Sequence, residues 1–298
     1  MTDPREKRID GKALAARIEE GVRAETERLR ARGVFPRLVS LAVKDAGAGF
    51  ASYMRSRERA CARVGIESVL ETVPLQNAER ELARAVMRLN EDRSVHGILL
   101  GLPFPSGVNE EVLFSLLDPE KDVEGQHPWN AGLLALGRPR FAPCTALAVL
   151  EILQEEGVPL EGTETVILGR SRVVGAPLAS LLLRKGKGGD ATVTVCHSRT
   201  RDLLHHIRQA EVLVAAVGRP EFVRGEWLRD GSVVIDVGTH AVEDPSAKKG
   251  WRMVGDVHYA SAEPVASRIT PVPGGVGPVT TAILLRATAR AAAGREDG

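Results

Sequence analysis

The stretch Thr165-Val-Ile-Leu-Gly-Arg-Ser-Arg-Val-Val-Gly-Ala-Pro177 decides how the second half of the chain folds. Its first four residues favour a buried parallel strand. Gly169 then ends the strand, and Gly175 opens a helical run that continues through three leucines to Leu182. A strand, a glycine turn and a helix N-terminus together suit an anion, because free N–H groups and the helix dipole point at the ligand. The spacing differs from G-x-G-x-x-G, so a plain strand–helix corner is the alternative.

A second strand is expected at Ala191–Val195, and the residues after it indicate which dinucleotide binds. In a nucleotide-binding βαβ unit this strand ends at the adenosine ribose, where an NAD site usually has Asp or Glu. This chain has Ser198 and Arg199 there, and Arg170 and Arg172 on the preceding loop. Hydroxyl and guanidinium groups suit a 2′-phosphate, so the pattern predicts NADP as the cofactor. Arginines that only solvate the loop are the alternative.

Length and composition limit the class of protein. The 298 residues suit one large or two ordinary domains, and the 43% hydrophobic fraction is enough for a full core. The 40 basic and 39 acidic residues leave a net charge of +1, which favours neither a nucleic-acid nor a membrane partner. No signal peptide and no membrane-spanning run is apparent. Three widely spaced cysteines, Cys61, Cys144 and Cys196, predict neither disulfides nor a metal site, so we expect a cytoplasmic protein.

The first half of the chain alternates helices and strands by its hydrophobic periodicity. We expect helices at 10–32, 50–64, 78–90 and 109–117, and strands at 37–43, 66–73 and 95–100. A glycine-rich loop is expected at 44–49. The segment 118–137 is predicted to be long and irregular, and such segments tend to carry function. A helix at 145–156 then leads into the second half.

The second half repeats a βαβ rhythm, which is typical of an α/β fold with a parallel sheet. Strands are expected at 165–168, 191–195, 211–217, 232–237 and 253–254, and a helix at 201–209. Asp236, which ends the fourth of these strands, either orients the nicotinamide end of a cofactor or caps a loop. A last helix at 279–293 is expected to return to the first domain.

Motifs spread over the whole chain resemble those of one enzyme family. In the second half they are Gly169-Arg-Ser-x-Val-Val-Gly-Ala-Pro177, Val233-Val-Ile-Asp-Val-Gly238, Gly255-Asp-Val257 and Thr270-Pro-Val-Pro-Gly-Gly-Val-Gly-Pro278. In the first half they are Asp10-Gly-Lys12, Tyr53 with Cys61 eight residues later, Gly97-Ile-Leu99, Pro119-x-Lys-Asp-Val123 and Pro143-Cys-Thr145. With these motifs in this order, the chain resembles the methylenetetrahydrofolate dehydrogenase/cyclohydrolase family.

The resemblance implies two α/β domains with a cleft between them for folate. The N-terminal catalytic domain would span 1–147 and be completed by a C-terminal helix at 280–298, and a Rossmann domain at 148–279 would bind NADP. It further implies a homodimer formed through the Rossmann domain. The activity implied is oxidation of 5,10-methylenetetrahydrofolate to 5,10-methenyltetrahydrofolate, with NADP as hydride acceptor.

Residue by residue, the resemblance implies that Arg170 and Ser198 hold the 2′-phosphate and that Tyr53 stacks on the pterin. Two glycines between prolines form a wall without side chains, where a flat ring can approach; a tight structural turn is the alternative. The candidate substrate residues are Tyr53, Glu124, Pro273, Gly274, Gly275 and Val276. The candidate cofactor residues are Gly169, Arg170, Ser171, Arg172, Gly175, His197, Ser198, Arg199, Val217 and Gly218.

Three positions of the implied folate pocket depart from the family's pattern. Arg57 stands where the family has Lys, four residues after Tyr53 and on the same helix face. Gly101 stands where the family has Gln, and Glu124 where it has the Asp that contacts the pterin. Tyr53, Arg57, Gly101 and Glu124 are the candidate catalytic residues.

These departures predict that cyclohydrolase activity is absent or weak. Hydrolysis needs proton transfer, which a lysine can perform and a guanidinium cannot. Dehydrogenation mainly needs the two rings to be positioned. Arg57 and Glu124 could instead form a bidentate pair across the space that Gly101 leaves. The alternatives are a member repurposed for another one-carbon or methylene-transfer reaction in a specialised pathway, and a non-catalytic binder of folate or NADP.

Overall fold

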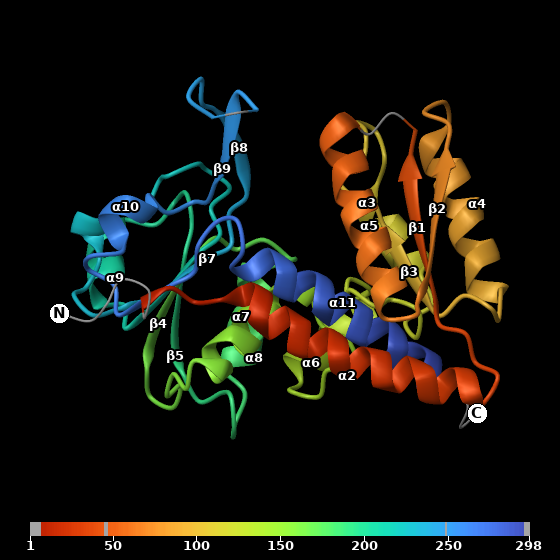
Figure 1. The fold of residues 1–298 in the computed structure, drawn as a ribbon, viewed down its shortest axis with the longest axis horizontal. Helices are drawn as coiled ribbons and strands as arrows, with labels where there is room; N and C mark the ends of the chain where they lie inside the picture. The colour runs from red at the N-terminus through yellow and green to blue at the C-terminus, as the bar shows by residue number, and fades with distance from the viewer. Residues whose placement is uncertain (1–6, 45–46, 248, 295–298) are drawn as a thin grey trace. The chain divides into compact units, whose positions relative to one another are not determined.

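The computed structural model describes residues 7–44, 47–247 and 249–294, without the side chains of 47–53 (Figure 1). The chain folds into two compact units. Unit 1 contains the residues up to Ala15 together with Thr145–Thr280, and unit 2 contains Ala16–Cys144 together with the residues from Thr281 onward. The domain limits expected at residues 147 and 279 stay predictions about which segments fold together.

Unit 2 is built on a three-stranded parallel sheet with the order β2-β1-β3. Its strands are β1 (Arg37–Val43), β2 (Glu67–Val73) and β3 (Gly97–Leu100), and two of its helices are α3 (Gly47–Arg63) and α4 (Ala78–Glu91). Helices α3 and α4 flank the sheet in Figure 1. The central strand β1 is apolar at nearly every position because both of its faces are covered. Val39 and Leu41 belong to the core that includes α4.

The segment expected to be irregular at 118–137 contains a helix, α6 (Pro128–Ala135), so that expectation is wrong. His127 caps α6: its Nδ1 accepts the backbone N–H of Trp129 at 2.9 Å. Pro128 occupies the first helical position, where a missing N–H costs nothing. Helix α3 likewise begins at Gly47, earlier than the expected start at residue 50. The remaining helices of this half are α2 (Gly11–Ala31) and α5 (Glu110–Leu116).

Unit 1 is built on a five-stranded parallel sheet with the order β10-β7-β6-β4-β5. Chain order reverses between β4 and β6, and ligands of doubly wound sheets bind at such a switch point, beyond the carboxyl ends of the strands. The strands are β4 (Glu164–Leu168), β5 (Thr192–Cys196), β6 (Val212–Ala215), β7 (Val233–Asp236) and β10 (Arg268–Ile269). The helices of the second half are α7 (Cys144–Glu155), α8 (Gly175–Leu182), α9 (Leu203–Gln209), α10 (Tyr259–Ala262) and α11 (Val276–Ala293), with a 3-10 turn at Gly225–Trp227.

One face of this sheet packs against α9 and α10. Val166 and Leu168 of β4 share a buried cluster with Ile207 of α9 and Ala262 of α10. Side chains alternate along a strand, so Ile167 points to the opposite face, where it is also fully buried. Burial on both faces explains why β4 consists of consecutive apolar residues. The same packing fixes the position of the loop that follows β4.

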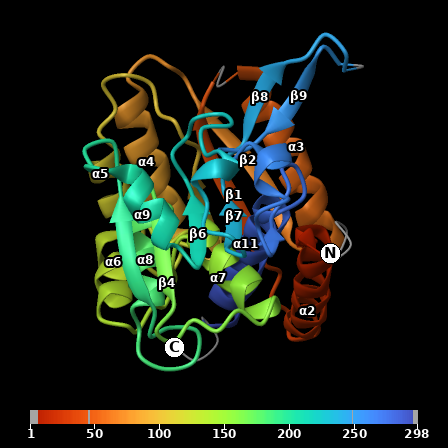
Figure 2. The ribbon, with the colours of Figure 1, turned by 90° about the vertical axis from the view of Figure 1, so that its left-hand side faces the viewer.

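A separate antiparallel ribbon follows β7. Its strands are β8 (His240–Glu243) and β9 (Trp251–Val254), paired from His240↔Val254 to Glu243↔Trp251. Figures 1 and 2 show the ribbon projecting beyond the end of the β7 strand. The strand expected at 253–254 therefore belongs to a hairpin and not to the parallel sheet, and its partner β8 is an addition to the expected strands. Within the described residues, no helix has the length and apolarity needed to cross a bilayer.

Candidate functional site

Two glycines make the strand–helix corner after β4. Gly169 has φ 118°, and a Cβ there would lie 2.1 Å from the carbonyl oxygen of Ala216. A Cβ on Gly175 would lie 2.0 Å from the carbonyl oxygen of Gly169. The backbone is packed so closely at the residue after β4 and at the start of α8 that only glycine fits at either position. Among the described residues no side chain caps α8 at Val174, which leaves the positive end of the helix to an anion.

A pocket of about 340 Å³ lies at the carboxyl ends of β4, β5 and β6. These three strands flank the switch point of the sheet, where a doubly wound fold binds its ligand. The pocket contains hydroxyl, imidazole and guanidinium groups over an apolar floor. Its lining residues are Leu168, Gly169, Arg170, Ser171, Cys196, His197, Ser198, Leu203, Ala216, Val217, Arg219 and Phe222.

Most of the candidate cofactor residues line this pocket, and the others surround it. Gly175 shapes the corner, and Arg172 lies exposed on the same loop. The backbone N–H of Arg199 donates to Nδ1 of His197 at 3.1 Å, so it orders the turn after β5. The N–H of Gly218 points to the carboxylate of Asp256 at 3.0 Å. A role of these residues in cofactor binding stays a prediction.

Arg219 and Phe222 form a wall of the pocket that the sequence did not reveal. The guanidinium carbon of Arg219 lies 4.9 Å from the centre of the Phe222 ring, a cation–π distance. Both residues follow β6 and line the pocket. No motif marks Arg-Pro-Glu-Phe as a binding segment, and only its place after a predicted strand could have drawn attention to it.

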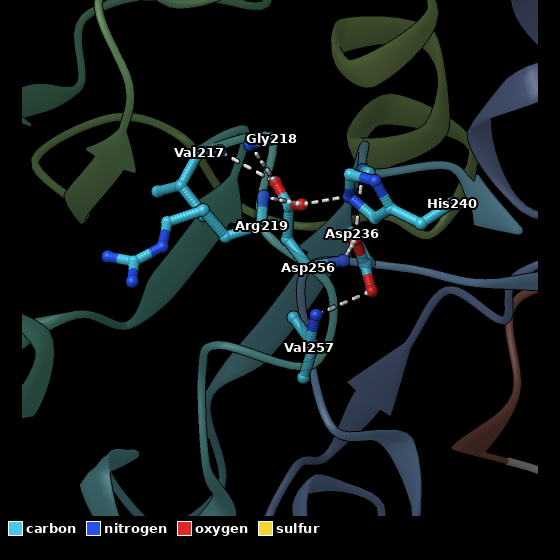
Figure 3. A network of polar contacts seen from close by, with 8 residues as sticks. Val217, Gly218, Arg219, Asp236, His240, Asp256 and Val257 are labelled. Atoms are coloured by element: carbon cyan, nitrogen blue, oxygen red, sulfur yellow. Dashed lines mark hydrogen bonds and ion pairs between the residues drawn. The ribbon is translucent and has the colours of Figure 1, made fainter. Parts of the chain in front are cut away.

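Asp256 anchors the loop that carries this wall (Figure 3). Its Oδ2 accepts the backbone N–H groups of Val217 and Gly218 at 2.6 and 3.0 Å. Its Oδ1 accepts the N–H of Arg219 at 2.9 Å and faces Nε2 of His240 at 2.7 Å. The residue is fully buried, so these donors take the place of water around its charge.

The Asp236 carboxylate caps the loop that contains Asp256, which is one of the two roles expected for it. It accepts the backbone N–H groups of Gly238, Asp256 and Val257 at 2.8 to 3.0 Å. Burial raises the pKa of Asp236 to about 7, against the opposing effect of these donors. A Cβ on Gly255 would lie 1.9 Å from its Oδ2, so the Gly255-Asp-Val257 motif requires glycine at its first position.

The Thr270–Pro278 motif forms a compact turn that leads into α11. The N–H of Gly275 donates to the carbonyl of Pro271 at 2.9 Å, and Gly274 has φ 108°. A Cβ on Gly11 would lie 1.9 Å from the carbonyl oxygen of Gly275, so this turn is in direct contact with the start of α2. Pro273, Gly274, Gly275 and Val276 are not among the lining residues of the 340 Å³ pocket, and their contact with folate stays a prediction.

In unit 2, Arg57 is a buried cation at the sheet. Only 1% of its surface is exposed. Its Nη2 donates to Oγ of Ser40 on β1 and lies 2.7 Å from Sδ of Met54. Gly101 follows β3 and donates its N–H to the carbonyl of Leu41, the neighbour of Ser40. The side chain of Tyr53 lies outside the described part of the chain.

Glu124 lies within the electrostatic reach of Arg57. Burial raises the pKa of Glu124 to about 7, the charge of Asp122 acts in the same direction, and the charge of Arg57 opposes both. Asp122 is a brace and not a free acid: it accepts the N–H groups of Gln126 and His127 at 3.0 and 2.8 Å, and Nδ2 of Asn130 at 2.8 Å. The structure thus places Arg57 against β1 and Gly101 directly after β3, and the charge of Arg57 acts on Glu124.

Lys121 fixes the segment that carries Glu124. Its ammonium donates to the carbonyls of Leu89, Asn90 and Asp92 at 2.6, 2.6 and 2.8 Å, which are carbonyls of the last turn of α4 and of the residue beyond it. Its own carbonyl accepts the N–H of Ile98 on β3 at 2.8 Å. The three cysteines Cys61, Cys144 and Cys196 are buried thiols.

A doubly wound parallel sheet with a basic pocket at its switch point defines a dinucleotide-binding domain. Here that domain is joined to a second parallel α/β unit with a buried arginine and a carboxyl group of raised pKa. The class is therefore a two-domain, nicotinamide-dependent oxidoreductase, and the α/β fold class expected from the sequence is confirmed.

Comparison with known proteins identifies the family. Residues 9–124 match the model for the catalytic domain of tetrahydrofolate dehydrogenase/cyclohydrolase, and residues 143–296 match the model for its NAD(P)-binding domain. The chain belongs to the tetrahydrofolate dehydrogenase/cyclohydrolase family. The resemblance drawn from the motifs is thereby confirmed, as is the assignment to dehydrogenase-type enzymes with an NAD(P)-binding domain.

Relatives match over nearly the full length. "Bifunctional protein FolD" of Geotalea daltonii is 45% identical over 284 residues, which cover 95% of this chain and 98% of the relative. A crystal structure of the bifunctional FolD enzyme of Campylobacter jejuni superposes with a TM-score of 0.89 at 38% identity, covering 97% of this chain and 99% of the other. The dehydrogenase–cyclohydrolase of Trypanosoma brucei, complexed with NADP and an inhibitor, gives a TM-score of 0.90 at 38% identity over 97% and 98% of the chains.

Proposed function

We propose that this protein oxidises 5,10-methylenetetrahydrofolate to 5,10-methenyltetrahydrofolate with NADP⁺. The relatives named above are dehydrogenase/cyclohydrolases, and one was solved with NADP. A bound NADP⁺ would supply the hydride acceptor, and the folate nitrogens would supply the electron push. The protein's own part is to hold two rings at reacting distance and to exclude water.

The observation that carries the proposal is the charge of the pocket in unit 1. None of the described residues that line it is acidic, whereas an NAD site uses a carboxylate to bind the ribose 2′-hydroxyl. Arg170 and Ser198 line it instead, two residues beyond the ends of β4 and β5. A guanidinium and a hydroxyl group match a 2′-phosphate, and the uncapped start of α8 suits the pyrophosphate.

For the folate we propose that Glu124 hydrogen-bonds the pterin and that Pro273–Val276 lines the approach to the nicotinamide. A carboxyl group whose pKa is about 7 is present in both protonation states at neutral pH, so it can accept from or donate to a pterin nitrogen. Tyr53 keeps its predicted role of stacking on the ring. The two glycines Gly274 and Gly275 leave this backbone without side chains.

Cyclohydrolase activity is proposed to be absent or weak. Proton transfer to or from an attacking water needs a group that can change its protonation state, and general acid–base catalysis contributes on the order of 10²–10⁴ in rate. Arg57 is buried against Ser40 and stays protonated. Glu124 titrates near neutral pH and can still move a proton, so weak residual hydrolysis is assigned to it.

An absorbance assay tests both parts. Purified protein with methylenetetrahydrofolate and NADP⁺ should generate NADPH, and much less reduced cofactor should form with NAD⁺. Added methenyltetrahydrofolate should disappear no faster than in buffer of the same composition. A protein that produces no NADPH contradicts the first part, and strongly accelerated loss of methenyltetrahydrofolate contradicts the second.

A homodimer formed through unit 1 is proposed as the working assembly. Strand β5 lies at the edge of the five-stranded sheet, and its central residues Val193, Thr194 and Val195 are only half-buried. An apolar edge strand of this kind is a place for a second copy to pair.

A further inference from the structure

Three consecutive backbone N–H groups after β6 point to one carboxylate. Val217, Gly218 and Arg219, here named the cofactor loop, donate to Asp256 at 2.6, 3.0 and 2.9 Å. Hydrogen bonds to a charged acceptor are roughly twice as strong as neutral ones. Asp256 lies 37 residues beyond Arg219 in the chain, so the contact is tertiary and not part of a local turn.

Close contacts on its own backbone and side chain hold the Asp256 carboxylate in one position. Asp256 is fully buried, and its own N–H donates to Oδ1 of Asp236 at 2.8 Å. A Cβ on Gly238 would lie 2.4 Å from the backbone nitrogen of Asp256 and 2.5 Å from its Oδ1. The cofactor loop is thus bound to a buried carboxylate that its own contacts hold in place.

His240 supplies a fourth donor to the same carboxylate. Its Nε2–H donates to Oδ1 of Asp256 at 2.7 Å, the oxygen that also accepts from Arg219 (Figure 3). His240 is the first residue of β8, and its partner across the ribbon is Val254, two residues before Asp256. The β8–β9 ribbon is therefore joined at its base to the group that holds the cofactor loop.

The cofactor loop carries one wall of the pocket. In Figure 3 the Arg219 side chain extends away from Asp256 while its backbone faces it. The guanidinium packs over Phe222, and both residues line the pocket. A guanidinium stacked on an aromatic ring presents a flat, positively charged surface, which suits a purine ring or a phosphate. Small shifts of the loop would move this surface.

On the basis of the NADP-dependent activity proposed above, we infer that Asp256 and His240 are positioning residues for the cofactor. Asp256 fixes the cofactor loop so that Arg219 and Phe222 face the dinucleotide, and His240 holds the carboxylate in the orientation that serves all three N–H groups. Neither side chain is among the residues lining the pocket, so their effect passes through the backbone of the loop.

Direct binding of NADP⁺ to the full-length protein, measured by calorimetry, tests the role of His240. His240→Ala should raise the Kd about tenfold, as expected for the loss of one hydrogen bond to a charged group. His240→Gln, whose amide nitrogen can reach the same oxygen, should restore most of the affinity. Trp251→Ala is the matched control, since Trp251 lies exposed on the same ribbon, at the far end from His240.

Hydrogen exchange at Val217–Arg219 gives a readout that does not depend on the cofactor. Exchange should be faster in His240→Ala than in the wild type, and unchanged in Trp251→Ala. An unaltered Kd and unaltered exchange in a folded His240→Ala variant would overturn the inference, as would an equal loss in Trp251→Ala. If the wild type fails to bind NADP⁺, the proposed function falls, while the exchange data still decide whether His240 orders the loop. Asp256→Asn, if folded, should show the larger effect on both measurements.

Discussion

The raised pKa of Glu124 leads to a prediction about stability, because the shift is present in the folded state only. Its pKa rises from 4.5 in the unfolded chain to about 7, chiefly by burial. Between these values the folded state binds more protons, so the free energy of unfolding falls as pH rises from about 4.5 to about 7 and stays low above that. The Glu124 residue is only half-buried, so the full penalty is discounted. Glu124→Gln removes the penalty and should be more stable than the wild type at pH 8 by about 1–2 kcal/mol.

Urea unfolding at pH 8 and at pH 4.5 measures this difference. The two proteins should differ at the higher pH and coincide at the lower one, where Glu124 is protonated in the folded wild type. The control is Glu161→Gln, which changes an exposed carboxylate and should leave the difference near zero at both pH values. Equal stability of Glu124→Gln and the wild type at pH 8 would show that the carboxylate is not desolvated.

The replacement of Lys by Arg57 leads to a prediction about cyclohydrolase activity. Arg57→Lys, combined with Gly101→Gln and Glu124→Asp, should increase hydrolysis of methenyltetrahydrofolate by at least about tenfold, because a buried lysine can exchange a proton and a guanidinium cannot. Arg57→Met with the same two changes is the control and should stay inactive in hydrolysis. Rates are read from the absorbance of the substrate. Rapid hydrolysis by the wild type would contradict the premise.

At the residue scale the sequence predicted positions that motifs mark and missed those that only tertiary contacts create. Gly169 and Ser198 follow predicted strands, and the structure places both in the pocket. Arg219 and the loop-holding role of Asp256 depend on contacts between distant segments, which no local pattern encodes. Arg57 contacts Ser40 and Met54, and its charge acts on Glu124. The bidentate pair suggested for Arg57 and Glu124 stays a prediction.

At the scale of elements, helix α4 and the segment carrying Glu124 depend on one buried lysine. Lys121→Met removes a cation that serves three carbonyls at the end of α4 and leaves those acceptors without it. We expect a loss of about 2–4 kcal/mol in the free energy of unfolding. Chemical denaturation measures it, with the exposed Lys187→Met as control. A loss no larger than that of the control would mean that the helix end is satisfied by other groups.

Long elements were predictable and short ones were not, for a physical reason. Strand β1 matches its expected limits because seven consecutive residues favour one conformation. Helix α6 has eight residues and begins with the side chain of His127 as its cap, and histidine is a weak capping signal. Among the described residues strand β8 pairs with β9 alone, and it alternates in burial, so it has no apolar run to reveal it.

At the scale of the whole molecule, both units share the same kind of strand order. Each has a parallel sheet whose first strand in the chain lies inside the sheet with neighbours on both sides, which gives the orders β2-β1-β3 and β10-β7-β6-β4-β5. The carboxyl ends next to each switch point hold the candidate site residues: Gly101 in unit 2, and Gly169 in unit 1. The βαβ rhythm of the sequence therefore predicted the fold class and the strand ends at which to search.

The assembly of two such chains is the last prediction, and it concerns β5. If copies pair along this edge, a lysine in its centre should keep them apart, because a charged side chain on an edge strand opposes pairing with another strand. The wild type should sediment at twice the 32.0-kDa chain mass, and Thr194→Lys should sediment as a monomer. Thr192→Lys, at the exposed start of the same strand, should stay dimeric and control for added charge. A monomeric wild type would contradict the homodimer. A Thr194→Lys variant that remains a dimer would show that the contact does not lie at β5. Because the cofactor pocket lies next to the end of β5, NADP⁺ affinity measured on the monomer also tells whether the pocket is complete within one chain.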